Sequence, residues 1–527
     1  MALWYYIEYI CIYLYIFCFV LTRSQGITKE LFMKRFAIVL LAVMLVVPLM
    51  FSCGDKDQAP VSESKEESET SEKVYKTPVK DMKDRSFNIL CHDFSAGSKS
   101  ILGYTGEVIY SEENPSSVDF AKKKVLQMTE DAYNCKIGGV LESTRSVTEI
   151  VQEQVQSGLQ EYDMVFDCVT SLAPLVSSGM LADLTSIPTI NLSDPWWDQN
   201  SVQDLSIAHK LYFVCGDINT YDNQGTWCML FNKTLKNKLN IQEDFYELAR
   251  SGQWNLDKFI EICRSGVTSN TNGDEVLDEF DRWAFGTECY NIYVHVVSAG
   301  EKIAEKNPET DLPYLNVAKK PEATFNVLDK VLDFYNDRST VMVANAPPYI
   351  NKGYPNVWEA TTHKAFIEGR ELFYMCGLIN VPSFRVMEDE FGILPIPKFS
   401  KDQDEYYHTV SVVNMSALAL PSNAKEIDDI GLIVSALSER SKEFVTPAYY
   451  DIQLKYRDSR DDESGEMLDL IFATRSFDIG ASFNWGQILN QYYSMDRSTI
   501  ASRFERVIDS IQIAMDDTIN AILDSNE

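Results

Sequence analysis

Short apolar runs alternate along the chain with segments whose apolar residues recur at three- and four-residue spacings. The first pattern predicts buried β-strands and the second predicts amphipathic α-helices. The predicted strands cover residues 87–90, 163–168, 211–215, 226–232, 391–397 and 412–421. The predicted helices cover residues 119–133, 147–158, 255–265, 322–336 and 425–445. Strands that alternate with helices in this way indicate an α/β fold built on mainly parallel sheets.

The clearest amphipathic pattern lies in residues 496–524. Its apolar positions are Ile500, Phe504, Ile508, Ile511, Met515, Ile519 and Ile522. These residues repeat at three or four positions and form one stripe on a helix. The pattern therefore predicts a long C-terminal helix with one buried face.

An export signal is predicted at residues 33–52. Lys34 and Arg35 follow a methionine, an apolar stretch comes next, and a single cysteine, Cys53, ends the segment. This order resembles a bacterial lipobox, in which the cysteine sulfur is diacylated and the peptide is cut on the N-terminal side of that cysteine. The resemblance implies a lipoprotein held on the extracellular face of the cytoplasmic membrane. A buried or transmembrane helix is the alternative, although the apolar run is short for a span.

The segments on either side of this signal carry no predicted domain. Residues 1–32 are interpreted as an upstream extension from a start assigned too early, and a first transmembrane helix is the alternative. Residues 53–84 begin with a polar, charged run that lacks an apolar period. Such composition predicts a flexible tether.

Charge and cysteine content narrow the range of partners. The formal net charge of −31 disfavours nucleic acid and anionic lipid headgroups as ligands. The cysteines beyond Cys53 show no CxxC pair and no zinc-type spacing, and several lie in apolar runs, so we expect buried thiols.

The order of several short motifs resembles the extracellular solute-binding proteins of ABC importers, the family 1 group that includes maltose-binding protein. The motifs are YDMVFD with LVSSGMLADLT (162–185), DPWWDQ (194–199), HKLYFVCGDI (209–218), LFNKTL (230–235), SGQWNLDK (251–258), AFIEGR (365–370), FGILPIPK (391–398) and ALPSNA (419–424). The run at 455–471 is similar to a clostridial branch of the family. The resemblance covers nearly all of the chain beyond Cys53.

The resemblance implies a two-lobed type II periplasmic-binding-protein fold with hinge strands and a ligand cleft between the lobes. Lobe one is expected to comprise 85–217 plus 397–440, and lobe two 222–392 plus 447–527. The polar stretch 216–224 fits a first hinge, 393–397 a second, and 440–450 a third. Such a protein would be a monomer that closes on a solute, most simply a carbohydrate, and delivers it to permease subunits.

Candidate ligand-binding residues follow from strand ends and from the family pattern. Carboxylates, amides and aromatic faces are the groups that recognise sugars, and ligands bind at strand carboxyl ends. The candidates are His92, Asp93, Ser95, Asp167, Thr170, Ser171, Asp222, Asn223, Tyr374 and Trp485. Each of these side chains could instead be a loop polar residue or a core aromatic.

The segment NTNGDEVLDEFD (270–281) resembles a calcium loop. On that frame the oxygen ligands would be Asn270, Asn272, Asp274, the Val276 carbonyl, Asp278 and Asp281. Glu275 replaces the usual glycine, so an acidic surface loop is the alternative. No other cofactor is expected.

Catalysis is not indicated by the motifs of the sequence, since the S-x-x-K at Ser62 to Lys65 lies in the predicted tether, where its serine cannot be a preorganised nucleophile. None of the five histidines forms HExxH, and neither GxSxG nor a Walker loop occurs. We therefore expect a binding protein and not an enzyme. The alternatives are a surface interaction protein derived from the same fold, or a secreted hydrolase.

Overall fold

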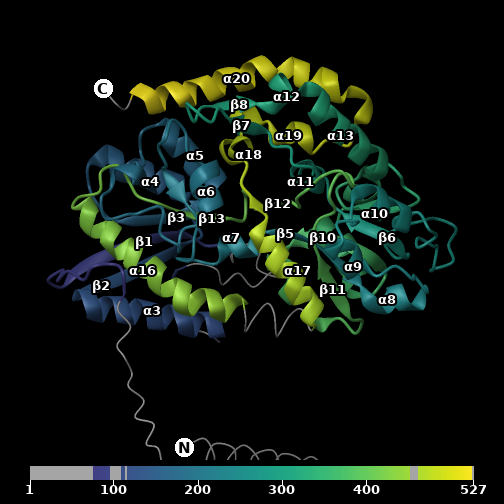
Figure 1. The fold of residues 1–527 in the computed structure, drawn as a ribbon, viewed down its shortest axis with the longest axis horizontal. Helices are drawn as coiled ribbons and strands as arrows, with labels where there is room; N and C mark the ends of the chain where they lie inside the picture. The colour runs from purple at the N-terminus through teal and green to yellow at the C-terminus, as the bar shows by residue number, and fades with distance from the viewer. Residues whose placement is uncertain (1–74, 95–107, 113–114, 451–460, 525–527) are drawn as a thin grey trace, which may run out of the picture. The chain divides into compact units, whose positions relative to one another are not determined.

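The computed structural model describes residues 75–94, 108–112, 115–450 and 461–524. The predicted signal, Cys53 and Ser95 lie outside these residues. Two five-stranded mixed sheets organise the described chain (Figure 1). We call the sheet that contains β1 and its helices lobe one, and the sheet that contains β5 and its helices lobe two.

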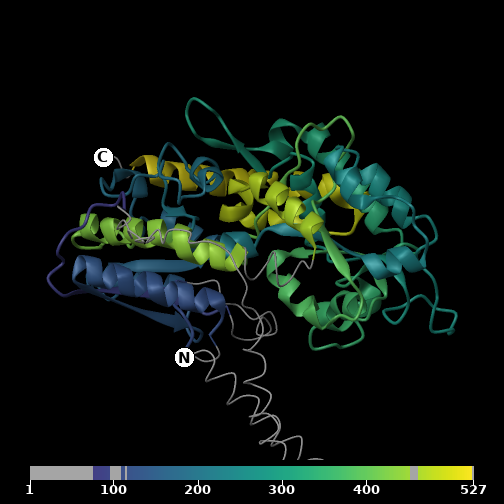
Figure 2. The same cartoon turned by 60° about the horizontal axis from the view of Figure 1, so that its bottom comes forward.

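Lobe one has the strand order β2-β1-β3-β13-β4. Its strands are β1 (Arg85–His92), β2 (Cys135–Glu142), β3 (Met164–Cys168), β4 (Phe213–Val214) and β13 (Ser416–Ala419). β1 lies parallel to β2 and β3, whereas β13 runs antiparallel to β3 and β4. The helices α3 (Ser117–Tyr133) and α16 (Ile427–Pro447) lie side by side next to this sheet (Figures 1 and 2).

Lobe two has the strand order β11-β5-β10-β6-β9. Its strands are β5 (Trp227–Asn232), β6 (Trp283–Thr287), β9 (Val341–Val343), β10 (Glu371–Gly377) and β11 (Phe391–Leu394). β10 and β9 flank β6 in parallel, while β5 runs antiparallel to β10 and β11. The helices that contact these strands include α8 (Lys233–Lys238), α9 (Phe245–Arg250), α13 (Pro321–Tyr335) and α17 (Asp462–Ala473).

The predicted α/β fold is confirmed, with one correction to the sheets. Both sheets are mixed and not mainly parallel, because β5 and β13 enter from segments that cross between the lobes. The predicted helices correspond to α3, α4 (Val147–Ser157), α10 (Leu256–Cys263), α13, α16 and α20 (Ile500–Asp524). The segment 371–377, which is not among the strands predicted from sequence, is the fully buried strand β10.

Local sequence explains where the helices begin. Ser116 caps α3 in a reciprocal capping box with Asp119, and the helix ends at Asn134 in the left-handed conformation. Asn255 caps α10 by accepting from the Lys258 amide. These caps lie just before the apolar periods that predicted the helices.

The order of the described elements gives three connections between the lobes. The first crossing runs from β4 to β5 through α7 (Tyr221–Gln224). The second runs from β11 to β13 through β12 (His408–Thr409), and the third from α16 to α17. β14 (Arg475–Ser476), just after α17, pairs in parallel with β12.

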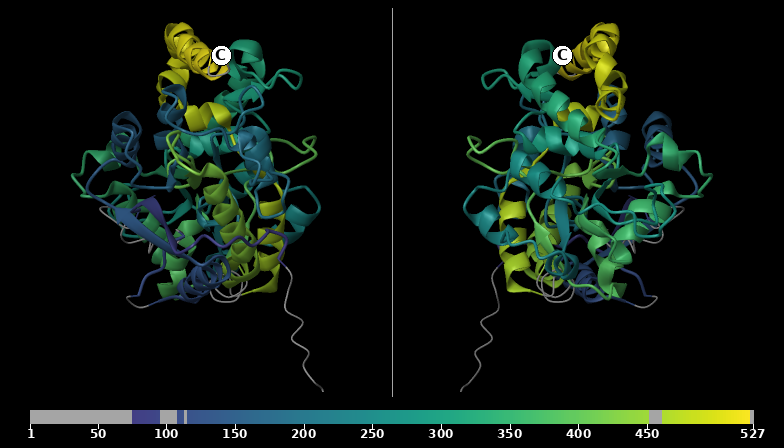
Figure 3. Two further views of the ribbon diagram at one scale, coloured as in Figure 1. Left: turned by 90° about the vertical axis from the view of Figure 1, so that its left-hand side faces the viewer. Right: turned by 90° about the vertical axis from the view of Figure 1, so that its right-hand side faces the viewer.

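The C-terminal helix α20 lies outside both sheets (Figures 1 and 3). It contacts α5 (Val169–Ser177) of lobe one and, through Phe504, the ring of Phe325 on α13 of lobe two. Its buried positions are Ile500, Phe504, Ile511, Met515, Thr518 and Ile522. Among the described residues, no helix has the length and apolar character needed to cross a bilayer.

Candidate functional site between the lobes

Polar side chains gather at the carboxyl ends of β1 and β3. His92 and Asp93 end β1 or follow it, and Asp167 lies at the end of β3. The two strands are parallel neighbours, so their ends share one edge of the sheet. The Nδ1 atom of His92 lies 4.0 Å from Oδ1 of Asp167. The structure thus brings together two candidate residues that are 75 positions apart in the sequence.

Thr170 and Ser171 join this edge through the first turn of α5. Cys168 is the N-cap of that helix, and its Sγ lies 3.4 Å from Thr170 Oγ1 and 3.0 Å from Ser171 Oγ. The Cys168 amide donates to Asp167 Oδ1 at 2.7 Å. Burial raises the pKa of Asp167, and the nearby His92 opposes that rise. The Asp167 side chain can accept hydrogen bonds as a carboxylate or donate one when it is protonated.

An apolar cluster joins this edge of lobe one to lobe two. It consists of Phe94, just after β1, Tyr221 in the first crossing, and Ile379, two residues beyond β10. Phe94 lies 5.0 Å from the Tyr221 ring and 4.6 Å from the His92 ring, measured between centroids. Cys168 packs against the same cluster. The carboxyl ends of β1 and β3 therefore meet the carboxyl end of β10 at this junction.

The second crossing also borders the junction. Thr170 Oγ1 lies 3.4 Å from the carbonyl of Val412, and the Ser411 amide donates to the Gly225 carbonyl of the first crossing at 2.8 Å. A polar group of lobe one therefore lies against the second crossing, which is itself hydrogen-bonded to the first. We take this junction as the candidate ligand site, because ligand sites occur at domain interfaces and at strand carboxyl ends.

Three residues of lobe two at the junction were missed by the sequence analysis. Glu288 directly follows β6, and the ring of Tyr290 stacks on that of Trp227 at 5.2 Å between centroids. Burial raises the pKa of Glu288 to about 7. Glu288 lies next to a strand end, as Asp167 lies at one. Recognising 283–287 as a strand would therefore have identified Glu288 as a candidate.

Asp222 and Asn223 form part of a buried network in the first crossing. Arg475 of β14 lies 2.6 Å from Asp198, 3.3 Å from Asp222 and 2.8 Å from Asn223 Oδ1. Burial raises the pKa of Asp222 to about 7, against the attraction of Arg475. These groups line a cavity of about 250 Å³. Their predicted contact with a ligand stays a prediction.

Tyr374 and Trp485 are both buried aromatic residues. Tyr374 lies in β10, is 1% exposed, and its hydroxyl accepts from Trp358 Nε1 at 2.6 Å. Trp485 is 4% exposed, stacks on Phe483, and donates to Thr518 of α20 at 3.0 Å. Each side chain is fully engaged in packing, and its stacking on a ligand stays a prediction.

The predicted calcium loop draws several of its proposed ligands together. Asn270 Nδ2 lies 3.4 Å from Asp274 Oδ1 and 3.4 Å from the Val276 carbonyl, and Asn272 donates to Asp274 at 3.0 Å. Asp281 is buried and accepts from the amides of Thr271, Asn272 and Asp278. Asp278 Oδ1 accepts from the Phe280 amide. Within the described chain, no three His, Cys, Asp or Glu side chains form a group that could hold a metal ion.

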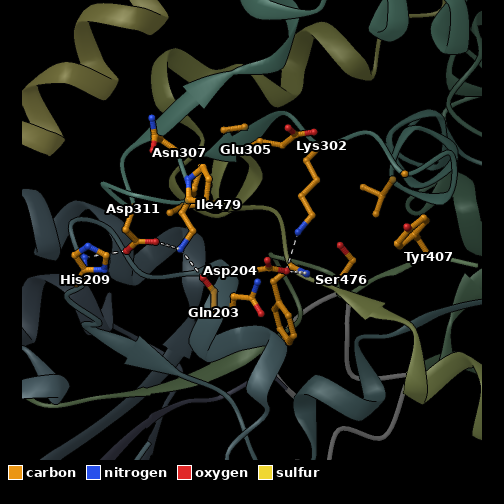
Figure 4. A pocket seen from close by; sticks show the side chains of 16 residues that line it. Gln203, Asp204, His209, Lys302, Glu305, Asn307, Asp311, Tyr407, Ser476 and Ile479 are labelled. Carbon is orange, nitrogen blue, oxygen red and sulfur yellow. Dashed lines mark hydrogen bonds and ion pairs between the residues drawn. The ribbon is translucent and has the colours of Figure 1, made fainter. Parts of the chain in front are cut away.

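A larger cavity of about 550 Å³ lies beside β14, between residues of both lobes (Figure 4). Lys302 Nζ lies 2.7 Å from Asp204 Oδ2 across the lobes. Lys306 pairs with Asp311 and donates to Ser206 Oγ at 2.7 Å. Because these charged groups satisfy one another, we place the candidate ligand site at the junction of strand ends instead.

No protein-family model matches the chain, and no curated protein matches its sequence. The solved structures that resemble it include a maltose/maltodextrin-binding domain from Bdellovibrio bacteriovorus bound to maltotriose, at 14% identity and a TM-score of 0.47. That match covers 84% of this chain and 99% of the other.

Two further structures show a similar extent of overlap. The ABC substrate-binding protein Lmo0181 from Listeria monocytogenes in complex with cycloalternan matches at 11% identity and a TM-score of 0.49, covering 83% of this chain and 99% of the other. UspC of M. tuberculosis matches at 14% identity and a TM-score of 0.49, covering 83% of this chain and 100% of the other. These matches have low identity and TM-scores below 0.5, so the function proposed below rests on this chain's own residues.

Proposed function

We propose that this chain is a solute-binding protein that captures a small molecule, with a carbohydrate as the leading class, between its two lobes. The observation that carries this proposal is the junction at which the ends of β1 and β3 meet the end of β10. There Asp167, His92 and Glu288 offer polar groups, and Phe94, Tyr221, Trp227 and Tyr290 offer aromatic rings. Sugars need both kinds of group, because their hydroxyls pair with carboxylates and their C–H faces pack on rings.

The crossing segments suggest how capture would work. Each lobe has its own sheet, and the segments that join the lobes border the junction. A solute that contacts both rims would favour a closed arrangement of the lobes, which is a population shift by differential binding. This mechanism needs no bond-making step, in keeping with a protein that binds but does not catalyse.

The cellular role is proposed from the sequence. A lipid on Cys53 would hold the binding body at the extracellular face of the cytoplasmic membrane, where it would deliver its solute to the permease subunits of an ABC importer. A surface interaction protein without a transported ligand is the alternative. Mass spectrometry of the native protein would test the anchor, which predicts an acylated Cys53 as the first residue; an intact peptide across Ser52 and Cys53 would contradict it.

The binding function can be tested by a thermal-shift screen of the purified chain against oligosaccharides, peptides and polyols. A ligand at 100 times its dissociation constant should add about 2.7 kcal/mol to the free energy of unfolding. Asp167→Asn should weaken binding of the best ligand, whereas Asp509→Asn on the exposed face of α20 should not. If no solute shifts the transition, the interaction-protein alternative is favoured.

A further inference from the structure

Glu288 is an acidic side chain with no counter-charge among the residues that the structure describes. It is partly buried at the end of β6, and no described residue donates to its carboxylate or forms an ion pair with it. The ionisable side chains that sense its charge are Cys289, Tyr335, Tyr374 and Cys376, none of which carries a positive charge. A carboxylate withdrawn from water in this way costs free energy until a donor or a cation reaches it.

Asp167 lies on the opposite side of the junction. It is 3% exposed, its carboxylate accepts from the Cys168 amide, and the His92 ring lies 4.0 Å away. Hydrogen bonds from the Cys168 and Ser171 side chains also favour its ionised form. Cys168, the next residue, packs on the cluster that includes Ile379 of lobe two. Two carboxyl groups therefore lie at one junction, one from each lobe, and of the two Glu288 has no charged partner among the described residues.

Aromatic rings complete the surroundings. Phe94 and Tyr221 are 2% exposed, and Trp227, which pairs with Gly377 at the end of β10, stacks on Tyr290. A cation held near aromatic faces is attracted by their ring quadrupoles. Carboxylates and rings in one junction recognise a positive group by two independent interactions.

We infer that the solute captured at this junction carries a protonated amine, as an amino sugar does. The inference rests on the proposed binding function and narrows its ligand class. Neutral hydroxyls could donate to Glu288 and Asp167 but would leave the charge of Glu288 uncompensated, whereas an ammonium group supplies donors and charge together. A small polyamine offers the same chemistry, and the experiment below distinguishes the two sources.

The test compares three disaccharides of the same linkage and ring geometry by calorimetric titration into the full chain at pH 7. They are the β-1,4-linked glucosamine dimer, its N,N′-diacetyl derivative and cellobiose, which differ only at the two C2 substituents. The glucosamine dimer should bind at least roughly tenfold more tightly than cellobiose, the size of one charge-assisted hydrogen bond. Tighter binding of spermidine than of any disaccharide would support a solute with a protonated amine and would identify that solute as a polyamine.

Single substitutions test which residues cause the preference for the amine. Glu288→Gln should remove most of the preference for the glucosamine dimer over cellobiose, and Asp167→Asn should act in the same direction. Glu322→Gln, at an exposed position of α13, is the matched control and should preserve the preference. Equal or tighter binding of cellobiose or the diacetyl dimer, no binding of any amine, or an unchanged preference in Glu288→Gln would overturn the inference.

The failure of this inference is separable from failure of the proposed function. A neutral solute that stabilises the chain in the broad screen, with no response to amines, would leave the binding function standing and remove only the amine. A chain that responds to no solute in either experiment would remove both.

Discussion

Ser177 on α5 and Thr518 on α20 lie with their hydroxyl oxygens 3.1 Å apart, although 341 residues separate them in the sequence. The Thr518 oxygen also accepts from the indole of Trp485 at 3.0 Å. One buried hydroxyl therefore joins the C-terminal helix to a helix of lobe one and to the segment before it.

Thr518→Val should destabilise the protein. The change keeps the side chain's shape but leaves the Trp485 N–H without an acceptor in a buried position, at a cost of about 1–3 kcal/mol. Urea unfolding of the two proteins would measure the difference. Ser502→Ala, on the exposed part of α20, is the control and should change stability little; an equal loss in both variants would contradict the role of this hydroxyl.

Glu371 should make stability fall as pH rises. It is fully buried in lobe two, and neither carboxylate oxygen has a partner among the described residues. Burial holds the pKa of Glu371 well above its ordinary value. The folded state thus keeps a proton that the unfolded chain loses above pH of about 4.3, and the free energy of unfolding drops by up to about 1.4 kcal/mol per pH unit until the folded pKa is passed.

Glu371→Gln removes this titration. The variant should match its parent near pH 5 and exceed it in stability near pH 8, as measured by urea unfolding at both values. Glu505→Gln, on the exposed face of α20, should leave the pH dependence of the parent unchanged. A parent-like slope in Glu371→Gln would show that the carboxyl finds a partner.

Arg475 should contribute strongly to the stability of the folded protein, because it lies where the crossing segments meet. It contacts Asp198 of lobe one and both Asp222 and Asn223 of the first crossing. Arg475→Met would leave two buried carboxyl groups without a counter-charge, which costs about 3–5 kcal/mol when one partner of a buried pair is removed. Thermal unfolding would measure the loss, and adding Asp222→Asn should recover part of it. No recovery would mean that Asp222 is not a partner of Arg475.

The strand ends that could be predicted were those at apolar runs that the sequence analysis had assigned to strands. The runs before His92 and Asp167 were assigned in this way, so the polar residues at their ends became candidates. β6, five residues long like β3, carries a glycine, and β10 follows a helix-like segment, so these strands and Glu288 were missed. Neither pattern reveals a charge without a partner, because that property depends on what the folded chain brings nearby.

Long-range pairing explains the other differences. Asp222 and Asn223 were predicted as cleft groups from their place in a hinge, yet Arg475 lies more than 250 positions away in the sequence. Likewise, the stripe on the C-terminal helix predicted a buried face but not that its Thr518 would contact α5 of lobe one. Local periodicity identifies elements, while their partners follow from topology.

His295 should make the protein sensitive to acid. It is 2% exposed on α11 (Asn291–Ser298), with its ring edge-on to Tyr335, and burial lowers its pKa to about 3. Below pH of about 6.5 the unfolded chain binds a proton at this residue that the folded state does not, so stability is lost as pH falls. At pH 5 this loss amounts to about 2 kcal/mol. His295→Phe should lose less stability between pH 7 and 5 than its parent, and His209→Gln, at a surface position, should not.

The loop at 270–281 carries the predicted calcium ligands. We propose that it binds calcium, supported by the convergence of Asn270, Asn272, Asp274 and the Val276 carbonyl, which offer the hard oxygen ligands that calcium takes. Asp281 would have to give up amide hydrogen bonds to become a ligand, so affinity should be weak, on the order of the 10⁻⁴–10⁻³ M of extracellular modules. Calorimetric titration of calcium into chelator-treated protein should show heat in that range. Asp274→Ala should abolish the heat and Asp257→Ala, on α10, should not; no heat at millimolar calcium would leave an acidic surface loop.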